Sequence, residues 1–306
     1  MALTALAPAG AGSSGAAPER RRGGLIALAL LTPGLAYLAL FFLVPFISLL
    51  MTSFGINVPD QYGVFDYGFR WENYVDVIAA YWPQFLRSFW FALLATVFAL
   101  LIGYPIAYYI GVRIRERTLL RNLLLVLVIA PFFISFLLRT LAWKQILSDE
   151  GPVVSVLHFI GLMGPQDHIT GTAFSVVFGL TYNFIPFMTL PLFATLDRLD
   201  KRLLEAGSDL YASPRQTFFR ITLPLSLPGI VSGTLLTFIP ATGDYVNASQ
   251  SFLGSSSTAM IGNVIQSKFL ITVNYPQAAA LSILLMAVIV VIVSVYVRRS
   301  GTDDLL

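Results

Sequence analysis

Six long apolar runs without a charged residue constrain this chain more than any other feature of its sequence. A helix that crosses a bilayer needs about 17 to 25 mainly apolar residues, and each run can hold one. A transmembrane barrel would instead show segments of about ten residues with alternating polarity. The pattern therefore predicts an all-α, polytopic integral membrane protein with about six transmembrane helices. The runs cover residues 25–59, 88–112, 122–138, 169–196, 221–243 and 269–297.

The composition supports this class and argues against several site chemistries. Charged residues make up 11% of the 306 residues, whereas a soluble domain carries about 25%. Cysteine is absent, so disulfides and thiolate chemistry are excluded. His158 and His168 lie in a connection rich in Gly and Pro, without carboxylates at ligand spacing. We therefore expect solvated loop histidines and no metal site.

The basic residues indicate how the chain is oriented. If the N-terminus is cytoplasmic, 14 of the 19 Lys and Arg residues fall in inner segments. The positive-inside rule then predicts that both termini face the cytoplasm. This distribution follows the membrane, so lipids rather than nucleic acid are the expected surroundings. The inner basic residues are Arg20, Arg21, Arg22, Arg113, Arg115, Arg117, Arg121, Arg198, Lys201, Arg202, Arg215, Arg220, Arg298 and Arg299.

The segments outside the spans divide the chain further. Residues 1–22 are rich in Ala, Gly and Ser, and we expect an uncleaved, disordered cytoplasmic tail there. Residues 23–300 form the transmembrane domain, and residues 301–306 form a C-terminal tail. The long outer connections are either a receiving surface for an extracytoplasmic partner or interfacial anchors. One of them favours a short amphipathic helix from Trp71 to Ala80.

A polar, helix-forming insert at residues 203–222 separates the fourth and fifth runs. Apolar residues at helical spacing predict a first helix that begins at Leu203. Ala206 and Gly207 add a small-residue patch that another surface can approach closely. Exposed apolar patches generally mark interaction sites, so the insert is interpreted as a docking element. A helix lying flat on the inner membrane surface is the alternative, and it leaves the small-residue patch unexplained.

A second helix follows within the same insert. Ser213 at the N-cap, Pro214 at the first position and Gln216 three residues after the cap predict a capping box. Phe218 and its neighbours supply apolar contacts along this helix. Pro224 lacks a backbone N–H, so we expect a break near it before the next span.

The residues of this insert resemble the EAA signature of ABC importer permeases. The resemblance rests on Glu205-Ala206-Gly207 followed by Ile221-Thr222-Leu223-Pro224. In that family the segment is the coupling helix that fits a cleft of the cytoplasmic ATPase. Two residues depart from the pattern: Gly207 stands at the third alanine, and Tyr211 stands where the family usually has glycine. The resemblance assigns ATPase coupling to Leu204, Glu205, Ala206, Gly207, Asp209, Leu210, Tyr211, Ser213 and Pro214.

The resemblance extends over most of residues 85–297. The stretches "SFLLRTLAW" (135–143), "PFMTLPLFATLDRLDKRLLEAGSDL" (186–210), "LPLSLPGIVSGTLLTFIPATGDYV" (223–246) and "MIGNVIQSKF" (260–269) are similar to the spermidine/putrescine permease subgroup. It implies a type I importer permease fold in a bacterial plasma membrane. The implied partners are two copies of a cytoplasmic ATPase, a second homologous permease and an extracytoplasmic substrate-binding protein. Sulfate, ferric iron or a sugar are alternative substrates within the same class.

The chain offers no nucleotide site or hydrolytic motif of its own. A P-loop needs Gly-Lys-Ser/Thr to hold phosphates, and the three lysines follow Trp143, Asp200 and Ser267. Neither a His-Glu-x-x-His pair nor a Gly-x-Ser-x-Gly elbow occurs. We therefore expect a non-catalytic subunit without a cofactor, with ATP hydrolysis on another polypeptide.

Polar residues near the outer ends of the spans are candidates for the translocation path or its gate. Charges there are costly and favour a functional role. Asp244, after the fifth run, can attract a cationic substrate and is the first candidate. Tyr245, Tyr182 and Asn183 are weaker candidates, and Arg139 ends the third run. The alternative is that these residues reach for interfacial water, or that Arg139 and Asp244 form an ion pair that locks an outer gate.

Prolines within the runs suggest where a cavity forms. Pro186 and Pro240 lie near Asn183 and Asp244, and a proline bends its helix because it removes a hydrogen bond. Bends there can shape a cavity between helices.

Two rivals from other classes remain at this stage. An ion-coupled secondary transporter would show mid-span carboxylates and internal repeats, yet the six runs contain no Asp or Glu. A membrane scaffold or sensor would function without ATP. Recovery of an ATPase with the chain from native membranes would distinguish all three.

Overall fold

The computed structural model describes residues 22–59, 61–164 and 166–299. The chain separates into two compact units, Met1–Leu49 and Leu50–Leu306. The tails expected at residues 1–22 and 301–306 lie outside the described residues, apart from Arg22.

The first unit is a nearly continuous helix through the first apolar run. Leu30–Ser53 is long and apolar enough to cross a membrane. The boundary with the second unit falls near the end of this helix, between Leu49 and Leu50. A π-helical turn, η1, interrupts the α-helical hydrogen bonding without breaking the helix. The elements are α1 (Arg22–Leu38), η1 (Ala39–Leu43) and α2 (Val44–Ser53).

The second unit is helical apart from one small hairpin in its described part. Strands β1 and β2 pair antiparallel, with Ile56 opposite Asp66 and Asn57 opposite Phe65. The elements in chain order are β1 (Ile56–Asn57), β2 (Phe65–Asp66), α3 (Glu72–Tyr108), η2 (Tyr109–Arg113), α4 (Thr118–Ile129), η3 (Ala130–Phe133), α5 (Phe136–Leu147), α6 (Pro152–Phe159), α7 (Ala173–Asp197), α8 (Lys201–Asp209), α9 (Pro214–Thr217), η4 (Phe218–Thr222), α10 (Leu223–Leu225), α11 (Leu227–Thr242), η5 (Ser256–Thr258), α12 (Ile261–Leu270) and α13 (Tyr275–Arg299).

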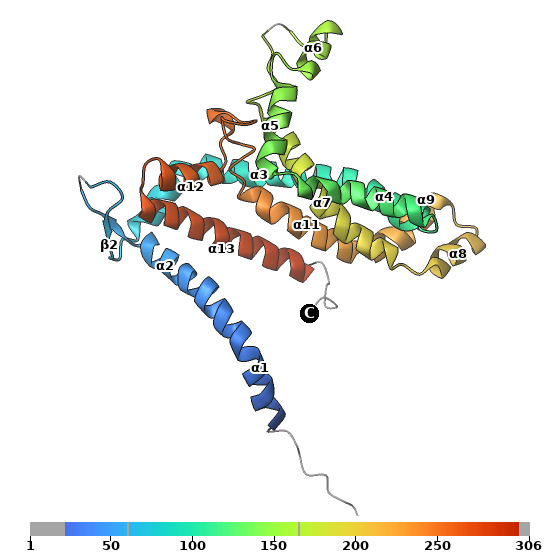
Figure 1. The fold of residues 1–306 in the computed structure, drawn as a ribbon, viewed down its shortest axis with the longest axis horizontal. Helices are drawn as coiled ribbons and strands as arrows, with labels where there is room; N and C mark the ends of the chain where they lie inside the picture. The colour runs from blue at the N-terminus through green and yellow to red at the C-terminus, as the bar shows by residue number, and fades with distance from the viewer. Residues whose placement is uncertain (1–21, 60, 165, 300–306) are drawn as a thin grey trace, which may run out of the picture. The chain divides into compact units, whose positions relative to one another are not determined.

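Helices α3, α7 and α11 pack side by side and form the core of this unit (Figure 1). Small residues allow their backbones to approach: Ala92 and Ala95 of α3 are fully buried, as is Ala241 of α11. A Cβ on Gly233 of α11 would lie 3.0 Å from the backbone oxygen of Met188 in α7. Close approach of small residues is how membrane helices gain packing energy, because lipid supplies no hydrophobic drive between them.

The spans follow the apolar runs, with differences at their ends. Within the described residues four helices are long and apolar enough to cross a membrane, and up to six if each of two bent pairs counts as one. The sixth span begins at Tyr275 rather than at residue 269, because α12 and a turn precede it. The short helix expected from Trp71 to Ala80 is not a separate element. It is the beginning of α3, which continues through Pro83 into the second span.

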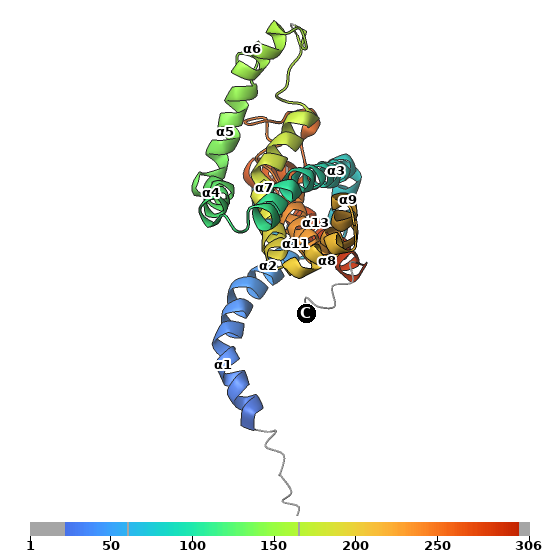
Figure 2. The same cartoon turned by 90° about the vertical axis from the view of Figure 1, so that its right-hand side faces the viewer.

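Both bent pairs belong to spans whose sequence contains proline. The helices of Thr118–Phe133 and Phe136–Phe159 meet at 94° just after Pro131 (Figure 2). Those of Pro214–Leu225 and Leu227–Thr242 meet at 61°. The break expected near Pro224 therefore falls two residues later, at Ser226, and Pro224 itself is helical. His158, expected in a loop, lies in α6.

Candidate functional site

The insert at 203–222 folds as a helix, a turn and a second helix between α7 and α11. The first helix, α8, begins at Lys201, two residues before the expected start. The second begins at Pro214, as predicted. The predicted capping box is present: Ser213 Oγ accepts from the Gln216 amide at 3.3 Å, and Gln216 Oε1 accepts from the Ser213 amide at 2.8 Å. Two backbone donors at the helix start are thereby satisfied.

Tyr211 terminates α8 in a conformation that normally belongs to glycine. Its φ is +57°, in the left-handed region. The amide of Ala212 donates to the Gly207 carbonyl at 3.0 Å, which is the long hydrogen bond of a Schellman helix end. The tight turn therefore forms despite the side chain, and the ring of Tyr211 is 99% exposed.

The predicted coupling residues lie mostly on the surface of this segment. Glu205, Ala206 and Asp209 are exposed, Leu204 is half-buried, and Gly207 is buried where Ile221 and Thr217 of the second helix lie against it. Leu210 is exposed beside Tyr211, and Phe219 is exposed further along. Exposed apolar residues on a charged hairpin are more typical of a surface that binds another protein than of a surface that stays in water.

Aromatic contacts and a hydrogen bond hold the segment to the rest of the protein. Phe218 of η4 packs edge-on against Tyr104 and Tyr108 of α3, with ring centroids 5.6 and 5.8 Å away. The Tyr104 hydroxyl lies 2.9 Å from the Ser226 hydroxyl, at the bend between α10 and α11.

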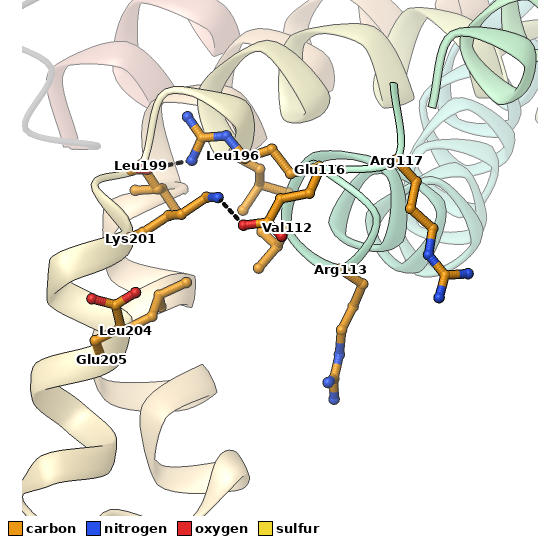
Figure 3. A pocket seen from close by; sticks show the side chains of 10 residues that line it. Val112, Arg113, Glu116, Arg117, Leu196, Leu199, Lys201, Leu204 and Glu205 are labelled. Atoms are coloured by element: carbon orange, nitrogen blue, oxygen red, sulfur yellow. Dashed lines mark hydrogen bonds and ion pairs between the residues drawn. The ribbon is translucent and has the colours of Figure 1, made fainter. Parts of the chain in front are cut away.

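A pocket of about 360 Å³ opens beside α8, between its first turns and the turn that links α3 to α4 (Figure 3). Lys201 Nζ reaches across to Glu116 Oε1 at 2.7 Å, and Glu205 also lines the pocket. The pKa of Glu116 is lowered by the hydrogen bond and charge of Lys201. In Figure 3 the side chains of Arg113 and Arg117 point away from Lys201.

The outer-gate candidates are only partly brought together. Asn183 of α7 is buried and donates through Nδ2 to Thr140 Oγ1 of α5 and to Asn247 Oδ1, both at 3.2 Å. Asn247 in turn donates to Asp244, from its amide to Oδ1 at 2.8 Å and from Nδ2 to Oδ2 at 3.1 Å. These bonds connect α5, α7 and the loop after α11. We call Thr140, Asn183, Asp244 and Asn247 the Asn183–Asn247 network.

Asn247 and Thr140 were not identified from the sequence. Asp244 and Asn247 are three residues apart, a spacing at which an Asp side chain closes a turn on the backbone. That signal is local and weak, whereas the contact of Asn247 with Asn183 depends on how α7 packs. Asp244 lies two residues beyond α11, and its burial raises its pKa to about 6, against the opposing effect of the Asn247 hydrogen bonds.

The side chains of the remaining gate candidates make no hydrogen bond with this network among the described residues. Arg139 of α5 is 8% exposed. Its Nε and Nη1 have no hydrogen-bond partner within the described residues, and its guanidinium lies 5.8 Å from the Phe136 ring centroid. Among the described residues it forms no ion pair with Asp244. Tyr182 packs against Trp143 at 5.2 Å, and Tyr245 is half-exposed.

An apolar groove of about 550 Å³ lies between α3, α4 and α7. Pro105, Pro131 and Pro186 line it together with Tyr182. Pro186 therefore lines a groove, while Pro240, Asn183 and Asp244 do not line this one. No group of three His, Cys, Asp or Glu residues at metal-binding geometry occurs in the described ranges.

Comparison with known proteins gives a consistent result. Residues 99–300 match the family described as "Binding-protein-dependent transport system inner membrane component". The spermidine/putrescine transport system permease protein PotB of Haemophilus influenzae is 36% identical over 269 residues, 87% of this chain and 91% of that protein. PotB of Escherichia coli (strain K12) is 36% identical over 265 residues, 86% of this chain and 94% of that protein.

A solved structure shares the fold. In the crystal structure of a bacterial ABC transporter involved in the import of the acidic polysaccharide alginate, one chain superposes with a TM-score of 0.64 at 21% identity. The match covers 92% of this chain and 96% of that chain.

Proposed function

This chain belongs to the binding-protein-dependent transport system inner membrane components and has the type I fold of ABC importer permeases, and we propose that it conducts polyamines such as spermidine or putrescine into the cytoplasm. The substrate is inferred from the 36% identity to PotB over most of both chains. The chain is a multi-pass membrane protein. The proposed location is a bacterial inner membrane, with both termini cytoplasmic, as the distribution of basic residues favours.

The observation that carries this proposal is the α8–η4 hairpin, with its capped second helix and exposed apolar residues. We propose that this hairpin, residues 203–222, docks into a cleft of a cytoplasmic ATPase. Leu210, Tyr211 and Phe219 would be covered there, which removes the cost of exposing them to water. The charges of Glu205 and Asp209 would set the orientation of docking, since charged groups fix register more than affinity.

The remaining partners follow from the same assignment. The chain lacks a P-loop, so two ATPase copies would supply the energy and this subunit would be non-catalytic. A second permease would complete the path, and an extracytoplasmic binding protein would deliver the polyamine to the outer loops. Binding of ATP would draw the ATPases together and tilt the spans from inward-open to outward-open through the docked hairpin. Hydrolysis would reset them.

The test uses the full transporter, with both permeases and the ATPase, in proteoliposomes that also receive the binding protein. We expect ATP-dependent uptake of radiolabelled spermidine that excess putrescine reduces and that sulfate, ferric iron or a sugar leaves unchanged. Uptake that needs a proton or sodium gradient instead of ATP would contradict the importer assignment. Uptake of one of the competing solutes instead of polyamines would contradict only the substrate.

The docking role is tested with Glu205→Lys and Ala206→Trp. Each should abolish uptake and release the ATPase while the protein remains in the membrane. Glu150→Lys is the matched control, because it makes the same charge change on an exposed residue in the turn between α5 and α6. It should retain the ATPase on purification. Normal ATPase recovery and full transport by Glu205→Lys would count against docking through this hairpin.

A further inference from the structure

We call the hairpin of residues 203–222 the coupling hairpin. The turn between α3 and α4 is held to the base of this hairpin by a set of ionic contacts. Asp197 is the last residue of α7, and its Oδ2 accepts a hydrogen bond from Arg121 Nη2 at 2.7 Å. Arg115 Nε lies 3.7 Å from Asp197 Oδ1. Arg115 Nη1 also donates to the Leu199 carbonyl at 2.8 Å. Lys201, the first residue of α8, pairs with Glu116 at 2.7 Å.

These contacts involve both sides of a short connection. Residues 198–200 join the end of α7 to the start of α8. The ion pair of Asp197 with Arg121 lies at one end of this connection, and the ion pair of Lys201 with Glu116 lies at the other. Asp197, Arg115 and Arg121 are each about three-quarters buried, where ionic contacts are screened less than at the surface. Each arginine that loses this carboxylate would keep a partly buried charge without compensation.

The backbone is built for close contact at the same place. A Cβ on Gly111 of η2 would lie 3.3 Å from the Asp197 amide nitrogen and 3.3 Å from Leu196 Cβ. A glycine thus lets the end of α3 lie directly against the end of α7. The segment there is π-helical, with Ile114 donating to the Tyr109 carbonyl at 3.1 Å, and π-turns occur often at functional sites.

Contacts made by Arg87 and Ser88, near the middle of α3, allow this helix to act as a lever. Ser88 Oγ accepts from the Ile261 amide at 2.7 Å, and Arg87 Nη1 donates to the Ala259 carbonyl at 3.0 Å. The outer loop before α12 is therefore attached to the helix whose inner end meets the hairpin. Both sets of contacts lie on one continuous helix, Glu72–Arg113 with η2 included, which is 42 residues long.

We propose that Asp197, Glu116 and Lys201 form an ionic clamp that transmits movement of the coupling hairpin to the inner ends of α3 and α4. The hairpin is already continuous with α7 and α11 through the chain. The clamp adds a lateral connection, so that α3 and α4 move with it when the ATPases close. These three are positioning residues, since none of them needs to touch substrate or nucleotide. The inference rests on the proposed function.

Ion-pair reversal gives the sharpest test. Glu116→Lys and Lys201→Glu each place like charges together, and the double swap restores an opposite pair. Both residues are exposed, so the fold should tolerate all three variants. In the reconstituted transporter we expect each single variant to keep its ATPase and its ATP hydrolysis while uptake per ATP falls by about fivefold or more. The double swap should recover most of that loss.

Asp197→Asn extends the test to the buried part of the clamp, where we also expect uptake per ATP to fall. Arg117→Gln is the matched control: it removes a positive charge from the same turn, where Arg117 has no side-chain hydrogen bond or ion pair among the described residues. Its uptake per ATP should equal that of the wild type.

Three results would overturn the clamp. They are wild-type uptake per ATP in both single variants, a double swap no better than the worse single variant, and loss of the ATPase in the single variants, which would assign these residues to docking. Absence of ATP-dependent uptake in the wild type would instead refute the proposed function.

Discussion

The side-chain amide of Asn183 in α7 donates to the side-chain oxygen of Asn247, in the loop after α11, at 3.2 Å. Two segments that are 64 residues apart are thereby joined at a buried position. Thr140 and Asp244 extend this bond into the Asn183–Asn247 network. A buried polar network stabilises a fold only while its members are satisfied, since an unpaired group in low dielectric is costly.

Replacing Asn183 should therefore destabilise the protein. Asn183→Leu keeps the branching and the number of side-chain heavy atoms and removes both donated bonds, which leaves the Asn247 oxygen without its partner. The expected loss is about 1 to 3 kcal/mol of unfolding free energy, seen as a lower melting temperature of the detergent-purified complex. Ser232→Ala removes only a local bond to the Pro228 carbonyl within α11 and should change the melting temperature little. Equal melting temperatures for the two variants would contradict the network's structural role.

Asp244 should make stability depend on pH. Its pKa is raised to about 6 in the folded protein, from about 4 in an unfolded chain. Between these values the folded state binds more protons than the unfolded state. The free energy of unfolding therefore falls by up to about 3 kcal/mol as pH rises from about 4 to about 6, and it is constant above that interval. Asp244→Asn cannot ionise. Its melting temperature relative to the wild type should therefore rise across that interval, and a constant difference would refute the assignment.

The transport role of Asp244 is a separate prediction. If its carboxylate attracts a polycation near the outer end of the path, Asp244→Asn should raise the KM for spermidine uptake, because the attraction is lost. Tyr245→Phe is a useful comparison, since it changes a neighbouring half-exposed side chain without changing charge. Unchanged transport kinetics in Asp244→Asn would remove the residue from the path and leave it a turn-closing side chain.

The sequence predicts the helical class and the two helices of the hairpin at residues 203–222, for physical reasons that particular residues show. Uncharged runs of this length have few stable alternatives in lipid, because each backbone group must be paired within its own helix. Ser213, Pro214 and Gln216 form a helix cap through contacts between residues three positions apart. Such local contacts can be predicted directly from the order of the residues. The turn at Tyr211 forms because the hydrogen bond from the Ala212 amide to the Gly207 carbonyl offsets the modest conformational strain of a positive φ at Tyr211.

Features set by packing between distant segments could not be read in this way. The helix expected from Trp71 to Ala80 and the second span have the same helical periodicity. The sequence pattern therefore does not show that they join into the single helix α3. Pro131 signals a break, yet the 94° angle depends on what α5 packs against. Asn247 and Asp197 owe their roles to partners 64 and 76 residues away, and nothing near them in the sequence indicates those contacts.

The cap of the second hairpin helix gives a local prediction. Ser213→Ala removes the oxygen that accepts from the Gln216 amide, and such a loss costs about 1 kcal/mol. Hydrogen exchange of the amides of Gln216 and Thr217, which donate to the Ser213 side chain and carbonyl, should speed up by about fivefold in the reconstituted permease. Ser213→Thr keeps an oxygen and should exchange nearly as slowly as the wild type. If the two variants exchange alike, the cap does not stabilise this helix.

Tyr211 separates backbone strain from partner binding. A non-glycine residue at φ +57° costs about 1 to 2 kcal/mol, so Tyr211→Gly should relax the end of α8 and slow hydrogen exchange there. Tyr211→Ala keeps the Cβ and should leave exchange unchanged. Both variants lose the exposed ring, and if that ring is buried in an ATPase cleft, each should weaken ATPase binding by about fivefold or more in a titration of the purified complex. Full affinity in both variants would show that the ring stays in solvent, and the docking surface would then have to exclude it.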